Sequence, residues 1–314
     1  MKKIHLALLG LFTIAGLASC GEKNPAPTPP TPTPSGEYIQ TKEIIKLDNQ
    51  GTPTGGIRYT YNAEGKVIKE HPLHYDATTK KVVEEDFHKV FVYKDGLLRE
   101  EQGYSLNGGT TPILSNKVVY TYQGRKLVLE ESYSVDLATK RSELVGHVEY
   151  TWEGDRKKEA KVFTDNKFGA SGLTLTKKYR YENGLEIEDC YKADAPDIKS
   201  YSNESRYDAQ GRLLHRGFIQ WKQEEDNQGN FTGKYIEQEH YTTVNEYDAR
   251  GNFTKVTNQI SLHGVAQPAD IHTYTYSDPD AKGNPRKASI THTTSDGKSY
   301  SPSSETYSYT YAKR

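Results

Sequence analysis

A short phrase recurs along most of this chain and constrains the fold more than any other feature. Most copies have two aromatic residues at positions i and i+2, a short polar turn ending in glycine, then basic and apolar residues. The copy at Tyr59–Gly65 reads Tyr-Thr-Tyr-Asn-Ala-Glu-Gly, and the copy at Tyr179–Gly184 reads Tyr-Arg-Tyr-Glu-Asn-Gly. Successive turn glycines are 27 to 40 residues apart, which indicates a repeat with a period near 30. These glycines are Gly65, Gly96, Gly124, Gly154, Gly184, Gly211, Gly251 and Gly283.

Each phrase is predicted to form a β-hairpin. Asn183-Gly184 is a dipeptide that accepts positive φ at both central positions of a type I′ turn. Asn62–Gly65 matches a type I turn followed by a left-handed glycine. Within Tyr179–Tyr181 the two aromatic side chains fall on one face of a strand, while Lys178 and Arg180 fall on the other. This alternation with period 2 favours strands.

The repeats together predict one all-β domain. A unit of this length supplies two strands of about nine residues, one tight turn and one looser connection. We expect about 18 strands, all consecutive in sequence, hence a single antiparallel up-and-down meander over residues 37–314. The 24 Tyr, 26 Gly and 14 Pro residues agree, because they favour strands and turns over helices.

The meander is expected to curl or close into a large soluble barrel with tyrosines inside. A charge on nearly every strand occupies the face opposite the tyrosines, and a Lys or Arg facing lipid at mid-depth costs ~2–4 kcal/mol. The charged positions are Arg58, Lys69, Glu84, Arg99, Glu149, Lys178, Arg180 and Lys255. Eighteen strands would enclose a cylinder more than ~30 Å across. Either its walls flatten onto each other, or its interior is wet or holds a ligand.

The N-terminus has the features of an export signal. Lys2 and Lys3 precede an apolar run of 15 residues, Ile4–Ala18, which is too short to span a bilayer. The run ends in Leu17-Ala-Ser-Cys20, which resembles the lipobox of bacterial lipoproteins. The resemblance implies a signal peptide over residues 1–19, lipidation of Cys20 and attachment to a membrane. An ordinary signal peptide with an accidental cysteine is the alternative.

A proline-rich segment separates Cys20 from the repeats. Six prolines occur in the ten residues Pro25–Pro34, a composition that favours an extended polyproline II chain. Residues 20–36 are therefore expected to be a tether that holds the domain away from the membrane. We expect an outer-membrane lipoprotein, displayed on the cell surface or facing the periplasm.

Two resemblances concern the repeats themselves. Tyr207–Gly211 and Tyr247–Gly251, which read Tyr-Asp-Ala-x-Gly, resemble the YD repeats of RHS-type proteins. The whole chain is similar to uncharacterised bacterial lipoproteins of unknown function that are described as having a porin-like fold. That similarity rests on the lipobox, the proline-rich tether and the Tyr-x-Tyr hairpins. It implies a large up-and-down barrel or strongly curled sheet and no established activity.

The aromatic ladder is the main candidate for binding. Flat rings stack on sugars and hydroxyls donate hydrogen bonds, so the ladder could bind a glycan or a peptide. Alternatively its rings are cross-strand pairs that hold the sheet together, worth ~0.2–1 kcal/mol each. Trp221 breaks the repeat and is a separate candidate. The ladder candidates are Tyr59, Tyr61, Tyr93, Tyr120, Tyr122, Tyr150, Trp152, Tyr179 and Tyr181.

Several chemistries have no support in the sequence. The formal net charge of −1 lacks the basic excess that nucleic-acid binding requires. Asp278–Asn284 hints at a calcium loop but does not match an EF-hand, and no His-Glu-x-x-His motif occurs. Cys190 has no partner motif and is expected to be a half-buried strand residue. We therefore predict no enzyme, metal or cofactor.

The resulting functional hypothesis is a lipid-anchored binding or structural display module of the cell envelope, with a glycan as one candidate ligand. One alternative is a glycan hydrolase that uses two carboxylates on the charged faces. The other is a module that binds an envelope protein through an exposed edge strand.

Overall fold

The computed structural model describes residues 37–106, 109–165, 172–226, 228 and 231–313, so Cys20 and the tether lie outside the described residues. The described chain is all-β and antiparallel, with twenty strands in one sheet. They are β1 (Glu37–Leu47), β2 (Pro53–Tyr61), β3 (Val67–Asp76), β4 (Lys81–Glu84), β5 (Phe87–Lys94), β6 (Leu97–Ser105), β7 (Ile113–Gln123), β8 (Lys126–Val135), β9 (Ser142–Glu153), β10 (Arg156–Thr164), β11 (Gly172–Glu182), β12 (Leu185–Lys192), β13 (Ala195–Tyr207), β14 (Leu213–Glu225), β15 (Phe231–Tyr247), β16 (Phe253–Leu262), β17 (Val265–Ala266), β18 (Asp270–Pro279), β19 (Pro285–Thr294) and β20 (Ser299–Lys313).

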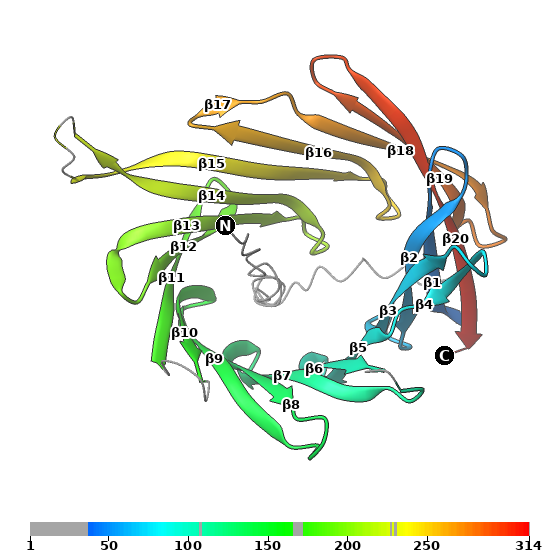
Figure 1. The fold of residues 1–314 in the computed structure, drawn as a ribbon, viewed down its shortest axis with the longest axis horizontal. Helices are drawn as coiled ribbons and strands as arrows, with labels where there is room; N and C mark the ends of the chain where they lie inside the picture. Colours follow the sequence, from blue (N-terminus) through cyan, green and yellow to red (C-terminus); the bar gives the residue numbers. More distant parts are fainter. Residues whose placement is uncertain (1–36, 107–108, 166–171, 227, 229–230, 314) are drawn as a thin grey trace, which may run out of the picture.

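The sheet closes into a barrel. The first strand pairs with the last, from Glu37 opposite Lys313 to Leu47 opposite Ser304. β4 and β5 both pair with β3, and β17 and β18 both pair with β16, so the twenty strands fill 18 positions. The predicted up-and-down meander of about 18 strands is confirmed. Figure 1 shows a wide, round ring, so the chain does not adopt the flattened arrangement.

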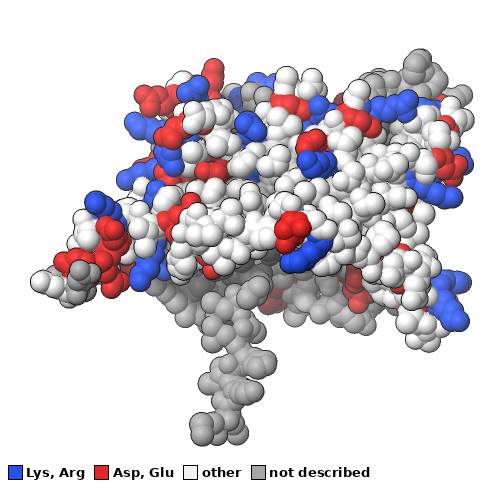
Figure 2. Space-filling view, turned by 90° about the horizontal axis from the view of Figure 1, so that it is seen from above, with Lys and Arg blue, Asp and Glu red and all other residues white. Residues whose placement is uncertain are grey.

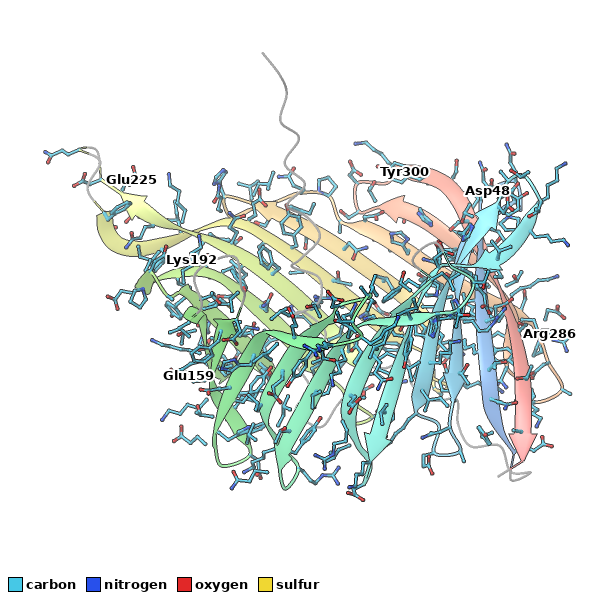
Figure 3. The ribbon with its side chains drawn as sticks, turned by 60° about the horizontal axis from the view of Figure 1, so that its bottom comes forward. Asp48, Glu159, Lys192, Glu225, Arg286 and Tyr300 are labelled. Atoms are coloured by element: carbon cyan, nitrogen blue, oxygen red, sulfur yellow. The ribbon has the colours of Figure 1, made fainter. Side chains whose placement is uncertain are left out.

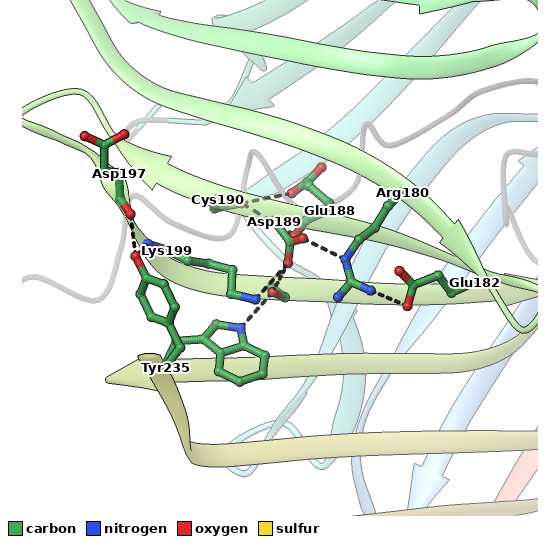
Figure 4. A network of polar contacts seen from close by, with 10 residues as sticks. Arg180, Glu182, Glu188, Asp189, Cys190, Asp197, Lys199 and Tyr235 are labelled. Carbon is green, nitrogen blue, oxygen red and sulfur yellow. Dashed lines mark hydrogen bonds and ion pairs between the residues drawn. The ribbon is translucent and has the colours of Figure 1, made fainter. Parts of the chain in front are cut away.

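The strand register separates two continuous faces around the ring. On one face, Tyr150 of β9 lies opposite Ala160 of β10, and Ala160 lies opposite Lys177 of β11. Lys177 in turn lies opposite Cys190 of β12. This aromatic face is the concave, inner one, where a closed sheet brings side chains together. Arg180 and its neighbours on the other face lie on the outer side of the wall (Figure 4). Figure 2 shows Lys, Arg, Asp and Glu scattered over the outer surface.

Two features depart from the expected division of the faces. Arg99 lies at a bulge in β6, and its guanidinium is 5.1 Å from the centre of the inward-facing Tyr122 ring. Ionic side chains also occupy the inner face, among them Glu130, Lys177 and Glu188. These groups are paired with each other or with tyrosine hydroxyls, so their burial is compensated.

The turns follow the sequence pattern closely. All eight turn glycines have positive φ, between 57° and 87°. At the type I′ turn Asn183 and Gly184 have φ of 51° and 76°. In the copy that follows Tyr247, Asp248 Oδ1 accepts hydrogen bonds from the Arg250 and Asn252 amides, at 2.8 and 2.9 Å. The aspartate of the Tyr-Asp copies is therefore a brace for its own turn.

A bulge follows most of the turns, and it explains the second aromatic of each phrase. In β8, Leu127 and Leu129 pair with consecutive residues of β7, which leaves Val128 as an extra residue. A bulge interrupts the ladder and frees backbone groups. Trp152 of the next copy donates its indole N–H to the Leu127 carbonyl at 2.8 Å. Equivalent bonds at bulges join Tyr181 to the Lys157 carbonyl and Tyr247 to that of Leu213. Tyr309 bonds the Pro285 carbonyl in the same way, although the β18–β19 ladder has no bulge there.

The basic residue near each glycine also contacts the following copy. The Lys66 ammonium lies 4.9 Å from the centre of the Tyr93 ring. The Lys126 ammonium donates to the Gly154 carbonyl at 2.6 Å. Each phrase thus contacts the next along one rim of the barrel, so the repeated residues stabilise the packing of neighbouring hairpins.

Candidate functional site

The predicted ladder residues all lie on the inner face, but most of them are part of the wall. Tyr61 packs with Ile39 and Val67, while Tyr120 packs with Val118 in a second buried cluster. Each cluster joins neighbouring strands of the ring. The ladder thus matches the cross-strand packing alternative closely. The members are Tyr59, Tyr61, Tyr93, Tyr120, Tyr122, Tyr150, Trp152, Tyr179 and Tyr181.

Trp221 lies on the outer side, apart from the ladder. Its indole N–H donates to the Ser202 hydroxyl at 2.8 Å, and the Lys199 ammonium lies 3.9 Å from the ring centre. Tyr235 reaches from β15 across β14: its hydroxyl accepts from the Lys199 amide at 2.9 Å and donates to the Asp197 carbonyl (Figure 4). The Trp221 ring is therefore held within a network that joins β13, β14 and β15.

Asp189 is the centre of the same outer network. The Ser202 hydroxyl donates to its carboxylate, and Arg180 Nε donates to it at 2.8 Å (Figure 4). Burial alone would raise the pKa of Asp189, but the bonds from Arg180 and Ser202 lower it below its usual value. The Asp189 carboxylate is therefore ionised and hydrogen-bonded, and the network joins the strands from β11 to β15.

A second polar cluster lies on the inner face between β8 and β13. Glu188 Oε1 accepts from the Asn203 amide at 2.9 Å and lies 3.1 Å from the Lys177 ammonium. Its other oxygen accepts from the Tyr179 hydroxyl at 2.9 Å. Three strands away from Lys177, Glu130 of β8 accepts from the Tyr150 hydroxyl at 3.2 Å. The two carboxylates of this inner cluster are buried in the wall, and their partners are half-buried.

The two carboxylates of the inner cluster differ in protonation. Burial raises the pKa of Glu130 to about 7, and the Tyr150 hydrogen bond only partly offsets this. Burial also acts to raise the pKa of Glu188, but Lys177, Asn203 and Tyr179 outweigh it and lower that pKa. Such divergence is typical of acid–base pairs in enzymes. Here both oxygens of Glu188 are occupied by fixed donors, which suits a brace better than a nucleophile.

A row of exposed apolar side chains crosses the inner face of β14, β15 and β16. Phe218 lies directly opposite Tyr241, which lies directly opposite Ile260. Their exposed fractions are 37, 41 and 39%, whereas the ladder side chains are buried or half-buried. The Tyr201 ring extends the row, with its centre 5.6 Å from that of Phe218. Exposed apolar side chains that adjoin one another mark binding surfaces.

Hydrogen-bonding side chains flank this exposed row (Phe218, Tyr241 and Ile260) on both sides. Gln220 and Glu239 lie opposite each other on one side. Thr243 and Asn258 lie opposite each other on the other side, and the Thr243 hydroxyl donates to the Asn258 side chain at 2.9 Å. An apolar platform bordered by planar polar groups can stack on a ring and bond its substituents.

The exposed row and the sequence candidate Trp221 share strand β14 but lie on different faces of it. Trp221 is a candidate because it breaks the repeat, and it lies in the same segment as Phe218, Phe218–Lys222. Phe218 and Trp221 are three positions apart, which places them on opposite faces of β14. Tyr241 lies in β15, whose 17 residues make it the longest of the strands described.

The residues described include neither a cluster of metal-ligating side chains nor a helix that could span a membrane. The described part of the chain contains no group of three or more His, Cys, Asp and Glu side chains arranged to hold a metal ion. In the segment Asp278–Asn284, Asp280 Oδ1 accepts hydrogen bonds from the Lys282 and Asn284 amides, at 2.8 and 2.9 Å. Among the residues described, no helix is long and apolar enough to cross a membrane.

Comparison with known proteins gives structural likenesses without a family. No protein-family model matches the chain, and no curated protein is detectably similar to it. A porin-like protein from Bacteroides uniformis has a TM-score of 0.40 at 12% identity, covering 91% of this chain and 100% of that one. A porin-like protein from Bacteroides vulgatus has a TM-score of 0.32 at 12% identity, covering 87% and 98%. A DUF3836 family protein from Bacteroides vulgatus has a TM-score of 0.25 at 15% identity, covering 29% and 92%.

Proposed function

We propose that this protein is a glycan-binding module displayed in the bacterial cell envelope, with its ligand on the inner face of the barrel. The observation that carries the proposal is the exposed row of Phe218, Tyr241 and Ile260. These side chains lie inside a closed ring and still remain more than a third exposed. A ligand that covers them gains the free energy of apolar burial, about 25 cal/mol per Å².

A sugar fits the chemistry of this surface. Aromatic rings stack on the apolar faces of pyranose rings, while hydroxyls need donors and acceptors at the ring edge. The exposed row supplies two aromatic rings, and its borders supply the amides of Gln220 and Asn258 and the carboxylate of Glu239. A purely apolar ligand would leave these polar groups without new partners.

The envelope location rests on the N-terminal sequence and on the outer face. Cys20 in its lipobox-like setting would attach the chain to a membrane by acylation. The outer face carries ion pairs such as Arg58 with Glu43, 2.7 Å apart, which suits a wall in water. Replacing Cys20 with alanine should move the protein from the membrane fraction to the soluble fraction. A variant that still sediments with membranes would contradict the anchor.

The experiment for binding is a panel of soluble polysaccharides, namely glucans, mannans, xylans and chitin fragments, assayed by affinity electrophoresis and calorimetry. We expect the wild-type chain to bind at least one without cleaving it, and Phe218→Ala with Tyr241→Ala to lose most of that binding. Phe231→Ala is the matched control, since Phe231 is 64% exposed at the far end of β15. Release of reducing sugar would favour the hydrolase alternative.

One observation favours a protein partner as the second candidate. β15 pairs with β16 only from Glu239 onward, whereas Phe231–Glu237 pairs with β14 alone among the described residues. Figure 1 shows this end of the β14–β15 hairpin projecting from the ring. An open strand edge can accept an extended peptide as an added strand. Failure of the glycan panel together with direct binding of a purified envelope protein would support this alternative.

A further inference from the structure

A second aromatic cluster lies on the inner face near the rim formed by the glycine turns. Phe253 of β16 lies between two tyrosines: its ring centre is 4.8 Å from that of Tyr247 and 6.0 Å from that of Tyr274. Phe253 is 38% exposed, as the exposed row is. Tyr247, Phe253 and Tyr274, named here the rim cluster, therefore form a second aromatic surface inside the barrel.

The rim cluster and the exposed row share two strands. Tyr241 of the row and Tyr247 of the cluster lie six residues apart on β15. At a rise of about 3.3 Å per residue, this separation is about 20 Å. On the neighbouring strand β16, Ile260 belongs to the row and Phe253 to the cluster. Both aromatic surfaces are therefore fixed on one rigid pair of strands.

Polar side chains fill the inner face between the two surfaces. Thr243 and Asn258 lie directly opposite each other, next to the exposed row. His272 of β18 lies opposite Val256 and is bonded to the Asp270 carboxylate at 2.7 Å. Hydroxyl, amide and imidazole groups from β15, β16 and β18 thus lie beside Val256 between the two aromatic surfaces, where they could bond the hydroxyls of a chain of sugar rings.

We infer that the ligand is an extended oligosaccharide that lies along β15 and β16 and contacts both the exposed row and the rim cluster. This inference rests on the proposed function and adds the length and direction of the ligand. A chain that reaches both surfaces makes its second contact at a high effective concentration, because the first contact already holds it in place. A short sugar reaches only one surface and gains nothing from the other.

The test compares chain lengths of whichever glycan binds in the panel, using its disaccharide and its hexasaccharide in calorimetric titrations. We expect the hexasaccharide to bind at least tenfold more tightly than the disaccharide. Phe253→Ala should weaken hexasaccharide binding about tenfold, the loss expected for one aromatic contact, and leave disaccharide binding at the exposed row unchanged. Phe218→Ala should weaken both ligands.

Two outcomes separate the inference from the function on which it rests. Equal affinities for the two lengths, or a Phe253→Ala variant that binds the hexasaccharide like wild type, would overturn the extended ligand while leaving glycan binding intact. If no glycan binds to the wild-type chain, both the inference and the proposed function are wrong. Phe231→Ala is again the control, and equal melting temperatures of all variants show that the barrel is preserved.

Discussion

Two carboxylates on the inner wall show how the surroundings of a side chain set its pKa. Glu130 and Glu188 lie in the same cluster, yet burial raises the pKa of one while three donors lower that of the other. A folded-state pKa above the unfolded value means that the protonated form is favoured by folding. Glu130 therefore contributes stability below its unfolded pKa of 4.5, and that stability is lost as the pH rises through about 7.

Glu130→Gln should make the barrel less sensitive to pH between 5 and 8. Because the pKa shift runs from 4.5 to about 7, the difference in unfolding free energy at pH 8 is up to about 3 kcal/mol in favour of the variant. Urea unfolding at a series of pH values measures this. Glu149→Gln on the outer face, where the Glu149 side chain is 55% exposed, is the control. A variant with the pH profile of wild type would show that Glu130 does not titrate in this range.

Asp248 is the second residue-scale case. Asp248→Ala removes two backbone-to-carboxylate hydrogen bonds in the turn and should lower the unfolding free energy by about 1–2 kcal/mol. Asp248→Asn should recover much of the loss, since Asn62 accepts the Lys66 amide at the equivalent turn. Thermal melting compares them with Asp155→Ala, where the Asp155 side chain is 99% exposed. Equal losses for Ala and Asn would argue against a turn brace.

At the scale of elements, the repeat is a bonded unit of a turn, a bulge and an anchoring aromatic. The bulge frees a carbonyl, and the aromatic of the following copy occupies it, so each hairpin depends on its neighbour. The Tyr-x-Tyr phrase is thus explained mainly by wall construction. The exposed row lies outside the repeated phrase, so its side chains are not used to join one hairpin to the next.

Tyr309→Phe removes the one hydroxyl that bonds the Pro285 carbonyl at 2.9 Å. Leaving a half-buried carbonyl without that partner should lower the unfolding free energy by about 1–3 kcal/mol. Tyr247→Phe should cost less, because the Leu213 carbonyl also accepts from the Asn245 amide at 3.0 Å. Chemical denaturation of both variants measures the difference. The reverse order of the two losses would contradict the anchoring role.

At the scale of the whole molecule, closure is the feature that creates an interior. The two buried clusters each join neighbouring strands, so the wall is stabilised along its circumference. Eighteen strand positions give a ring more than ~30 Å across, in which opposite inner faces stand apart. Such a wall leaves room inside for a ligand on the exposed row and the rim cluster. Figure 3 shows the strands crossing the wall obliquely, as closure requires.

A double variant, Thr41→Cys with Thr310→Cys, tests closure directly. These residues lie opposite each other on β1 and β20, and their hydroxyls are 2.6 Å apart. Cysteines at directly opposed positions can form a disulfide, so we expect rapid cross-linking under mild oxidation, visible on a non-reducing gel. Thr41→Cys with Ser304→Cys is the control, because Ser304 lies opposite Leu47. An absent cross-link in the first pair would mean that the ring is open in solution.

The sequence by itself determined the hairpins, the meander and the wall. Period-2 alternation and turn dipeptides such as Asn183-Gly184 act over a few neighbouring residues, so they can be read directly from the chain. The sequence could not determine which aromatic side chains pack within the wall and which stay exposed. Bulges change which face of a strand each residue occupies, and the hydrogen bonds of the aromatic side chains run to a neighbouring repeat. Only the tertiary register placed Phe218 opposite Tyr241 on the inner face, turned Trp221 outward and brought Thr41 against Thr310.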